Sequence, residues 1–266
     1  MERGEAVAIT LDAPDKTEIA TLGVVRLEVP RAFYLRRVQN LTGFLMSDSQ
    51  SSTGIFEDPA SAEDVAGLAL EPSDVKALAK CKPFSCDLKM PAEMMERFHV
   101  ALDKSRAAAP TADVLMREWL LDYVNAYRAD SNENLVVYDD TKRSVRSSDA
   151  FRALAAEPMP AGLDSEPFSR MLAVPRGARP PELSTRISWE IDRLPGLKPI
   201  LEVNERSMYF SPAHPGESWL TTKLLYASHY FESQIDFITV VDADTSAGKP
   251  ATYLVILRRQ KFDDLP

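Results

Sequence analysis

The chain has 266 residues, 45% of them apolar and 27% charged, a composition that supports one substantial hydrophobic core. Its formal net charge of -9, without a basic stripe that interleaves aromatic residues, argues against a nucleic-acid partner. No apolar run approaches the ~20 residues that cross a bilayer, and residues 1–5 lack the charged-then-apolar profile of a signal peptide. We therefore expect one domain over residues 1–266, with no membrane span.

The N-terminal part predicts an arm, a strand and a helix. Residues 5–22 are polar and contain proline, which favours irregular structure. Thr21–Val29 alternates apolar residues in a β-branched context, which predicts a strand that ends at Pro30. A helix can begin there, because a missing N–H costs nothing at a helix start. Strand and helix are expected to cover residues 21–46, with Leu35, Val38, Leu41 and Leu45 on the inner side of the helix.

Shorter segments follow this helix. Ser47–Gly54 contains only Ser, Asp, Gln, Thr and Gly, and we interpret it as a mobile loop. A short helix is expected from Ser73, and a short strand over Asp87–Met90.

Residues 91–173 predict a helical block. Apolar residues recur at spacings of three and four, and Thr111 and Ser147 or Ser148 stand where helix N-caps are expected. The predicted helices are Pro91–Arg106, Thr111–Ala129, Ser148–Ala156 and Ser165–Ala173.

The segment Arg176–Pro181 is too rich in proline and glycine to continue a helix, and the sequence after it has the character of β-structure. An antiparallel meander is expected over residues 186–260. The fold class predicted is α+β: a curved antiparallel sheet, made of the N-terminal strand and the C-terminal meander, covered by the central helical block. Its strands are expected at Arg186–Asp192, Ile200–Phe210, Trp219–Val241 with a break near Glu232–Gln234, and Thr252–Arg259, with loops at Ser211–Gly216 and Asp242–Pro250.

Cys81 and Cys86 are separated by four residues that include a proline, and a turn there can bring the two Cβ atoms within disulfide range. A bridge would indicate an oxidising compartment, whereas two unrelated, partly buried cysteines would suit a cytoplasmic protein. Two thiolates are too few for a structural zinc site.

Several strings resemble an uncharacterised family of predicted exported bacterial proteins. They are Cys81-x4-Cys86 followed by Leu88–Pro91, then Arg117-Glu118, Tyr127-Arg128, Leu197–Pro199 and Tyr226–Phe231. The resemblance covers roughly residue 70 to the end of the chain and implies a periplasmic or otherwise exported location. It implies no activity.

The order of the elements is also similar to that of helix-grip proteins of the START and polyketide-cyclase type. In those proteins a curved sheet folds over a hydrophobic cavity. Residues 91–173 would be an insertion here, and the long closing helix of that fold has no counterpart before Pro266.

The richest stretch of reactive side chains is Lys223–Glu232. Strand periodicity places Trp219, Lys223 and His229 on one face, and Tyr226 and Tyr230 on the other. A half-buried imidazole can act as a general base, which makes His229 with Tyr226 or Tyr230 the catalytic candidate. The alternative is a core histidine satisfied by one backbone carbonyl, since no partner carboxylate stands at a telling spacing.

Aromatic residues on the predicted sheet favour an apolar-ligand pocket. They can equally pack against the helical block. The candidate ligand-binding residues are Trp189, Tyr209, Trp219, Phe231, Phe237 and Tyr253.

No metal site or cofactor is expected, because the three histidines are dispersed and the common nucleotide and metal motifs are missing. The leading hypothesis is non-enzymatic binding of an apolar small molecule or lipid in a cavity between sheet and helices. The alternatives are an enzyme that uses His229, and a protein-interaction module whose partner is unknown.

Overall fold

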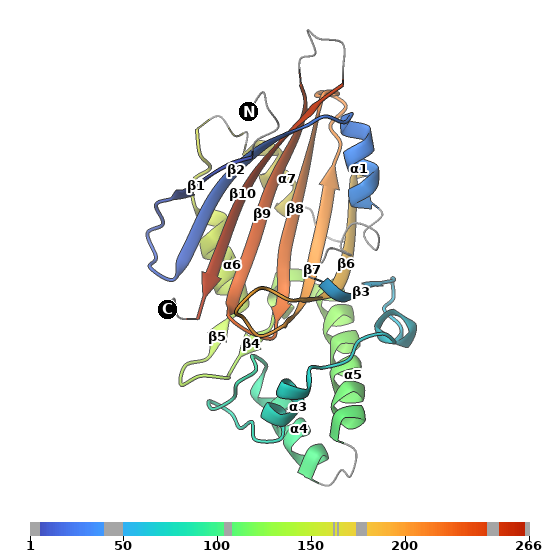
Figure 1. Cartoon of the computed structure of the whole chain (residues 1–266), viewed down its shortest axis with the longest axis vertical. Coiled ribbons are helices and arrows are strands. Elements are labelled where there is room, and N and C mark those ends of the chain that lie inside the picture. Colours follow the sequence, from blue (N-terminus) through green and yellow to red (C-terminus); the bar gives the residue numbers. More distant parts are fainter. Residues whose placement is uncertain are drawn as a thin grey trace.

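The computed structural model describes residues 6–39, 50–103, 108–161, 163, 165–173, 180–243 and 250–263. These residues form an α+β fold in which helices lie against a large antiparallel sheet (Figure 1). The predicted fold class is confirmed.

The sheet has the strand order β1-β2-β10-β9-β8-β7-β6-β3, and every pairing in it is antiparallel. Strands β6 to β10 are neighbours in chain order, which confirms the predicted meander. Strand β2 pairs with β10, so the N-terminal strand belongs to the same sheet. The strands are β1 (Val7–Leu11), β2 (Glu18–Leu27), β3 (Gln50–Phe56), β6 (Leu183–Asp192), β7 (Ile200–Tyr209), β8 (Glu217–Ala227), β9 (Phe231–Asp242) and β10 (Thr252–Phe262).

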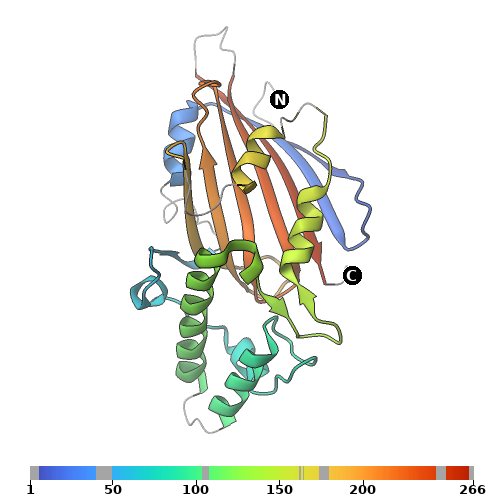
Figure 2. The same ribbon diagram turned by 180° about the vertical axis from the view of Figure 1, so that it is seen from behind.

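Helices lie on both faces of the sheet and at one end of it. α6 (Ser147–Ala156) and α7 (Glu166–Ala173) cover one face, and α1 (Arg31–Gln39) lies on the opposite face (Figures 1 and 2). We call these the α6/α7 face and the α1 face. Beyond the end that carries the β8–β9 turn lie α3 (Pro72–Leu78), α4 (Ala92–Asp103) and α5 (Ala108–Asp130). The remaining elements are the 3-10 turns η1 (Ala62–Val65) and η2 (Ser131–Asn134) and a hairpin of β4 (Val137–Tyr138) and β5 (Val145–Arg146).

The largest hydrophobic cluster joins helices and sheet. It contains buried side chains of α3 to α7 together with those of β3 and β6 to β10, such as Phe168, Trp189 and Leu257. A second cluster lies between α1 and the sheet and includes Leu35, Val38 and Leu220. The periodic apolar residues of the helices are therefore buried against large residues of the strands.

The predicted irregular arm at residues 5–22 is wrong. Val7–Leu11 forms the edge strand β1, and β2 already begins at Glu18. The connecting turn is closed by Asp15, whose Oδ1 accepts from the Thr17 amide at 2.8 Å and from its hydroxyl at 2.7 Å. A short polar segment whose side chains bond its own backbone forms a hairpin turn. The strand before the turn, with Val7, Ile9 and Leu11 in alternation, then pairs with β2.

The predicted mobile loop Ser47–Gly54 is also wrong where the structure describes it, because Gln50–Phe56 forms β3 and pairs with β6. Gly54 is the residue at which this strand packs most closely on its neighbours: a Cβ there would approach Trp189 and lie 2.7 Å from the Asp64 carbonyl oxygen. Gln50–Phe56 is thus an edge strand of the sheet, and its glycine allows the backbone to lie close to Trp189. Residues 40–49, with Leu41, Leu45 and the start of the loop, lie outside the described residues.

Smaller corrections concern segment ends. Asp87–Met90 is not a strand, and α5 begins at Ala108 instead of Thr111. The break between β8 and β9 was predicted at Glu232–Gln234 but falls at Ser228–Tyr230. Tyr230 has a φ of 64° in this turn. Most of Arg176–Pro181 and of the loop Asp242–Pro250, and residues 104–106 of the predicted helix, lie outside the described part of the chain.

Candidate functional site

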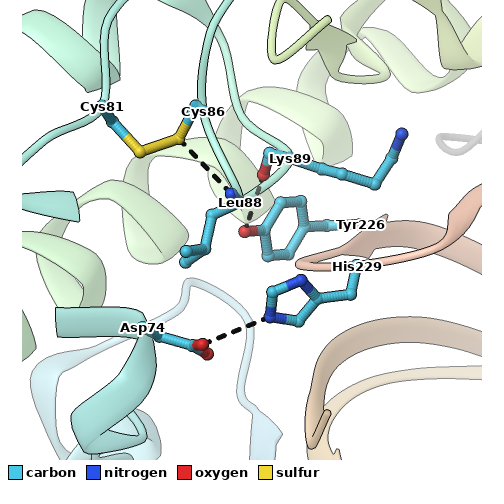
Figure 3. Close-up of a disulfide and its surroundings, with 7 residues drawn as sticks. All are labelled: Asp74, Cys81, Cys86, Leu88, Lys89, Tyr226 and His229. Carbon is cyan, nitrogen blue, oxygen red and sulfur yellow. Dashed lines mark hydrogen bonds and ion pairs between the residues drawn. A yellow bond between two sulfur atoms is a disulfide. The ribbon is translucent and has the colours of Figure 1, made fainter. Parts of the chain in front are cut away.

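His229 lies at the β8–β9 turn and faces α3. Its Nε2 is 3.3 Å from Oδ1 of Asp74, and both side chains are only 5% exposed (Figure 3). Pro72 begins α3 and places Asp74 in the first helical turn. His229 is thus a buried residue, as one interpretation held, but its polar partner is a carboxylate 155 positions away and not a backbone carbonyl.

Tyr226 lies on the α6/α7 face, in the same cluster as Trp219, although strand periodicity placed the two on opposite faces. The cause is an irregularity in the β7–β8 pairing: Val203 pairs with Tyr226 and Asn204 with Leu224, so Leu225 is an extra residue. Such a bulge shifts the alternation by one. The Tyr226 hydroxyl donates to the Lys89 carbonyl at 3.0 Å, and burial raises the pKa of this hydroxyl well above its ordinary value (Figure 3).

Tyr230 lies next to His229, with 5.7 Å between the ring centroids. Its hydroxyl accepts a hydrogen bond from the Lys198 amide at 2.9 Å. The structure therefore brings His229 and Tyr230 together, and directs the Tyr226 hydroxyl towards a different partner. All three polar groups fasten the turn to neighbouring segments.

The two cysteines form a disulfide, with 4.5 Å between their Cα atoms (Figure 3). The enclosed turn is fixed by a hydrogen bond from the Lys82 amide to the Ser85 carbonyl at 3.1 Å. The Cys86 amide donates to the Asp140 carbonyl, also at 3.1 Å. The bridge thus closes a local turn before α4, and the hydrogen bond from Cys86 to Asp140 ties this turn to the β4–β5 hairpin.

The six predicted ligand-binding aromatic residues pack mainly within the hydrophobic clusters. Trp189, Tyr209, Trp219 and Phe237 belong to the largest cluster, where Phe237 meets Phe168 of α7 at 5.1 Å between ring centroids. Phe231 packs on Phe262, and Tyr253 is half-buried on β10. Tyr209 also borders a hollow at the β7–β8 turn. Trp189, Tyr209, Trp219 and Phe237 are therefore buried in the cluster that joins the sheet to the helices, whereas Phe231 packs on a residue of β10. Whether any of the six contacts a ligand stays a prediction.

A hollow of about 330 Å3 lies on the α1 face, between α1 and strands β6 to β9. We call it the α1 hollow, and none of the six predicted aromatic residues lines it. Arg31 fixes the start of α1 above it by donating to Ser218 Oγ at 2.6 Å and to the Glu217 carbonyl at 3.1 Å. The helix side of the hollow is formed by Tyr34, Val38 and Gln39. Burial raises the pKa of Tyr34 to about 12.

The floor of the α1 hollow consists of two rows of cross-strand neighbours. In the first row Met208 pairs with Leu220, and Leu220 with Ile238, which gives an apolar floor beneath Val38. In the second row Arg186 pairs with Arg206, and Arg206 with Thr222. Paired residues of an antiparallel sheet share a face, so the hollow is apolar at one end and basic at the other.

A buried polar network continues from the basic end. An Arg206 N–H donates to Glu190 Oε1 at 2.5 Å, and another donates to the Ser188 hydroxyl. The Asn204 amide donates to Glu190 at 2.6 Å and to Glu202 at 3.0 Å. Burial, and then the charge of Glu190 directly opposite, raise the pKa of Glu202 to about 8.

Sequence reasoning missed the residues of the α1 hollow. The available signal was a pair of arginines inside two strands expected to be adjacent, at positions 186 and 206. Antiparallel pairing with the correct turn length would have placed them opposite each other.

Within the described residues, no group of three or more His, Cys, Asp or Glu side chains could hold a metal ion. None of the described helices combines the length and apolar character needed to cross a membrane. Comparison with known proteins finds no matching family model, no similar curated protein and no similar solved structure.

Proposed function

We propose that the chain binds a hydrophobic or lipid-like small molecule in the α1 hollow, without catalysis. The observation that carries the proposal is the apolar row Met208, Leu220 and Ile238 beneath Val38, which borders about 330 Å3 of space. Sites for small molecules are concave and mainly apolar, with a few placed polar groups, and the smallest have volumes of ~300 Å3. The cavity anticipated between the sheet and the helical block is assigned instead to the space between the sheet and α1.

No second function is proposed for the His229 region. The imidazole faces the Asp74 carboxylate, and the hydroxyls of Tyr226 and Tyr230 are bonded to backbone groups. None of the three lines the α1 hollow. These bonds support a structural role for the turn.

The test is calorimetric titration of 1-octanol into the wild-type chain and two variants. Ile238→Phe adds a ring at a half-buried position that lines the hollow, so we expect it to weaken binding at least tenfold. The matched control is Ile256→Phe on the neighbouring strand: Ile256 pairs with Ile238 and is also half-buried, but does not line the hollow. Absence of octanol binding to the wild type, or equal binding to both variants, contradicts the proposal.

We also propose that the chain functions in an oxidising compartment, as a periplasmic or otherwise exported protein. The Cys81–Cys86 disulfide supports this location, because such bridges persist where thiols are oxidised. Alkylation of protein from its native host, followed by mass spectrometry, should find both cysteines protected. Two alkylated thiols would contradict it.

A further inference from the structure

Arg186 and Arg206 form a cross-strand pair of like charges at the basic end of the α1 hollow. Like charges directly opposite each other destabilise a sheet unless an anion compensates them. The Glu190 carboxylate compensates the charge of Arg206, with 2.5 Å between Glu190 Oε1 and a guanidinium nitrogen of Arg206. Arg186 is exposed, and among the described residues it forms no ion pair; its guanidinium donates to the Gln39 carbonyl at 3.2 Å.

The buried carboxyls nearby do not supply the missing negative charge. With a pKa of about 8, Glu202 is mostly protonated at neutral pH. Asp236, two strands from Arg206 in the same row, is already held by Arg258 through bonds of 2.9 and 2.7 Å. The positive charge of Arg186 therefore has no carboxylate partner among the described residues at the basic end of the α1 hollow.

We propose that the ligand carries a carboxylate head group, bound by Arg186 and Arg206, with its apolar tail along Met208, Leu220 and Ile238. A guanidinium presents its N–H donors in a planar fork that matches a carboxylate. The Thr222 hydroxyl, next in the row, is a further donor. The ligand class is thus a small amphiphilic acid, and this inference rests on the proposed function of the hollow.

The test compares sodium octanoate with 1-octanol, which share the tail and differ in the head group. Calorimetric titration of the wild type should show octanoate binding roughly 10- to 100-fold more tightly, the range for hydrogen bonds to charged groups. Arg186→Gln keeps a donor for the Gln39 carbonyl and removes the charge, so it should abolish most of the preference for octanoate over octanol. The control, Arg36→Gln, removes an exposed arginine of α1 outside the hollow and should keep the preference.

Each outcome bears on one of the two proposals. Equal affinity of the wild type for octanoate and octanol overturns the carboxylate inference and leaves the apolar site standing. A full preference retained in Arg186→Gln, with its circular dichroism unchanged, or one lost equally in Arg36→Gln, also overturns the inference. Failure of both compounds to bind overturns the proposed function itself.

Discussion

Replacing Glu202 by Gln should change how the stability of the chain depends on pH. Glu202 is buried on β7, directly opposite Glu190 on β6, and accepts one hydrogen bond from Asn204 at 3.0 Å. Burial and the neighbouring carboxylate raise its pKa from the ordinary value of 4.5 to about 8. Between these pH values the folded state binds a proton that the unfolded state has lost, so the free energy of unfolding falls as pH rises.

The size of this effect follows from the two pKa values. At about 1.36 kcal/mol per pH unit, the difference between 4.5 and about 8 amounts to about 5 kcal/mol over the whole range. Roughly 4 kcal/mol of it falls between pH 5 and pH 9. Gln keeps the shape of the side chain and does not ionise, so the variant should lack this loss.

The assay is urea unfolding at pH 5, 7 and 9, followed by circular dichroism, for the wild type, Glu202→Gln and Glu96→Gln. The last variant removes an exposed carboxylate on α4 and should follow the wild type at every pH. Relative to the wild type, Glu202→Gln should gain about 4 kcal/mol between pH 5 and pH 9. A stability difference that is the same at both pH values would refute the reasoning.

Three further predictions concern the remainder of the fold. His229→Gln should lower the free energy of unfolding by about 1–3 kcal/mol, because a buried carboxylate loses its partner; octanol titration should show unchanged binding, and a stable variant without binding would place His229 in the site. Replacing both Cys81 and Cys86 by Ala should cost about 2 kcal/mol in urea unfolding, as expected for so short a loop, and no change would mean that the bridge does not stabilise the chain. Gly54→Ala should lower stability by about 1–3 kcal/mol in thermal unfolding, since its Cβ would lie 2.7 Å from the Asp64 carbonyl oxygen; a neutral result would show that β3 can shift.

The parts of the fold that could be predicted are those in which apolar residues recur at the spacing of a helix or a strand and are buried in the structure. Met116, Leu120 and Tyr123 recur at helical spacing and are buried on α5. The strands of the meander are long, rich in β-branched and aromatic residues, and separated by turn residues. In these segments local preference and tertiary packing agree, which is why the predicted positions were close to those observed.

The parts that could not be predicted depend on contacts between distant residues. Asp74 and His229 are 155 positions apart, and nothing in the local sequence of either indicates the other. The extra residue at Leu225 shifted Tyr226 to the other face of the sheet, which strict alternation cannot anticipate. The pairing of Arg186 with Arg206, and with it the α1 hollow, required the register of two strands.

Photo-crosslinking would test most directly whether the α1 hollow is the binding site. An octanoate analogue with a diazirine on its tail would be equilibrated with the wild-type chain, irradiated, and its attachment mapped by peptide mass spectrometry. The account predicts that the label falls on Tyr34 or Val38 of α1 and on Met208, Leu220 or Ile238 beneath it. Excess octanoate should prevent the labelling. Attachment confined to α4 and α5, or to the turn around His229, would contradict the assignment.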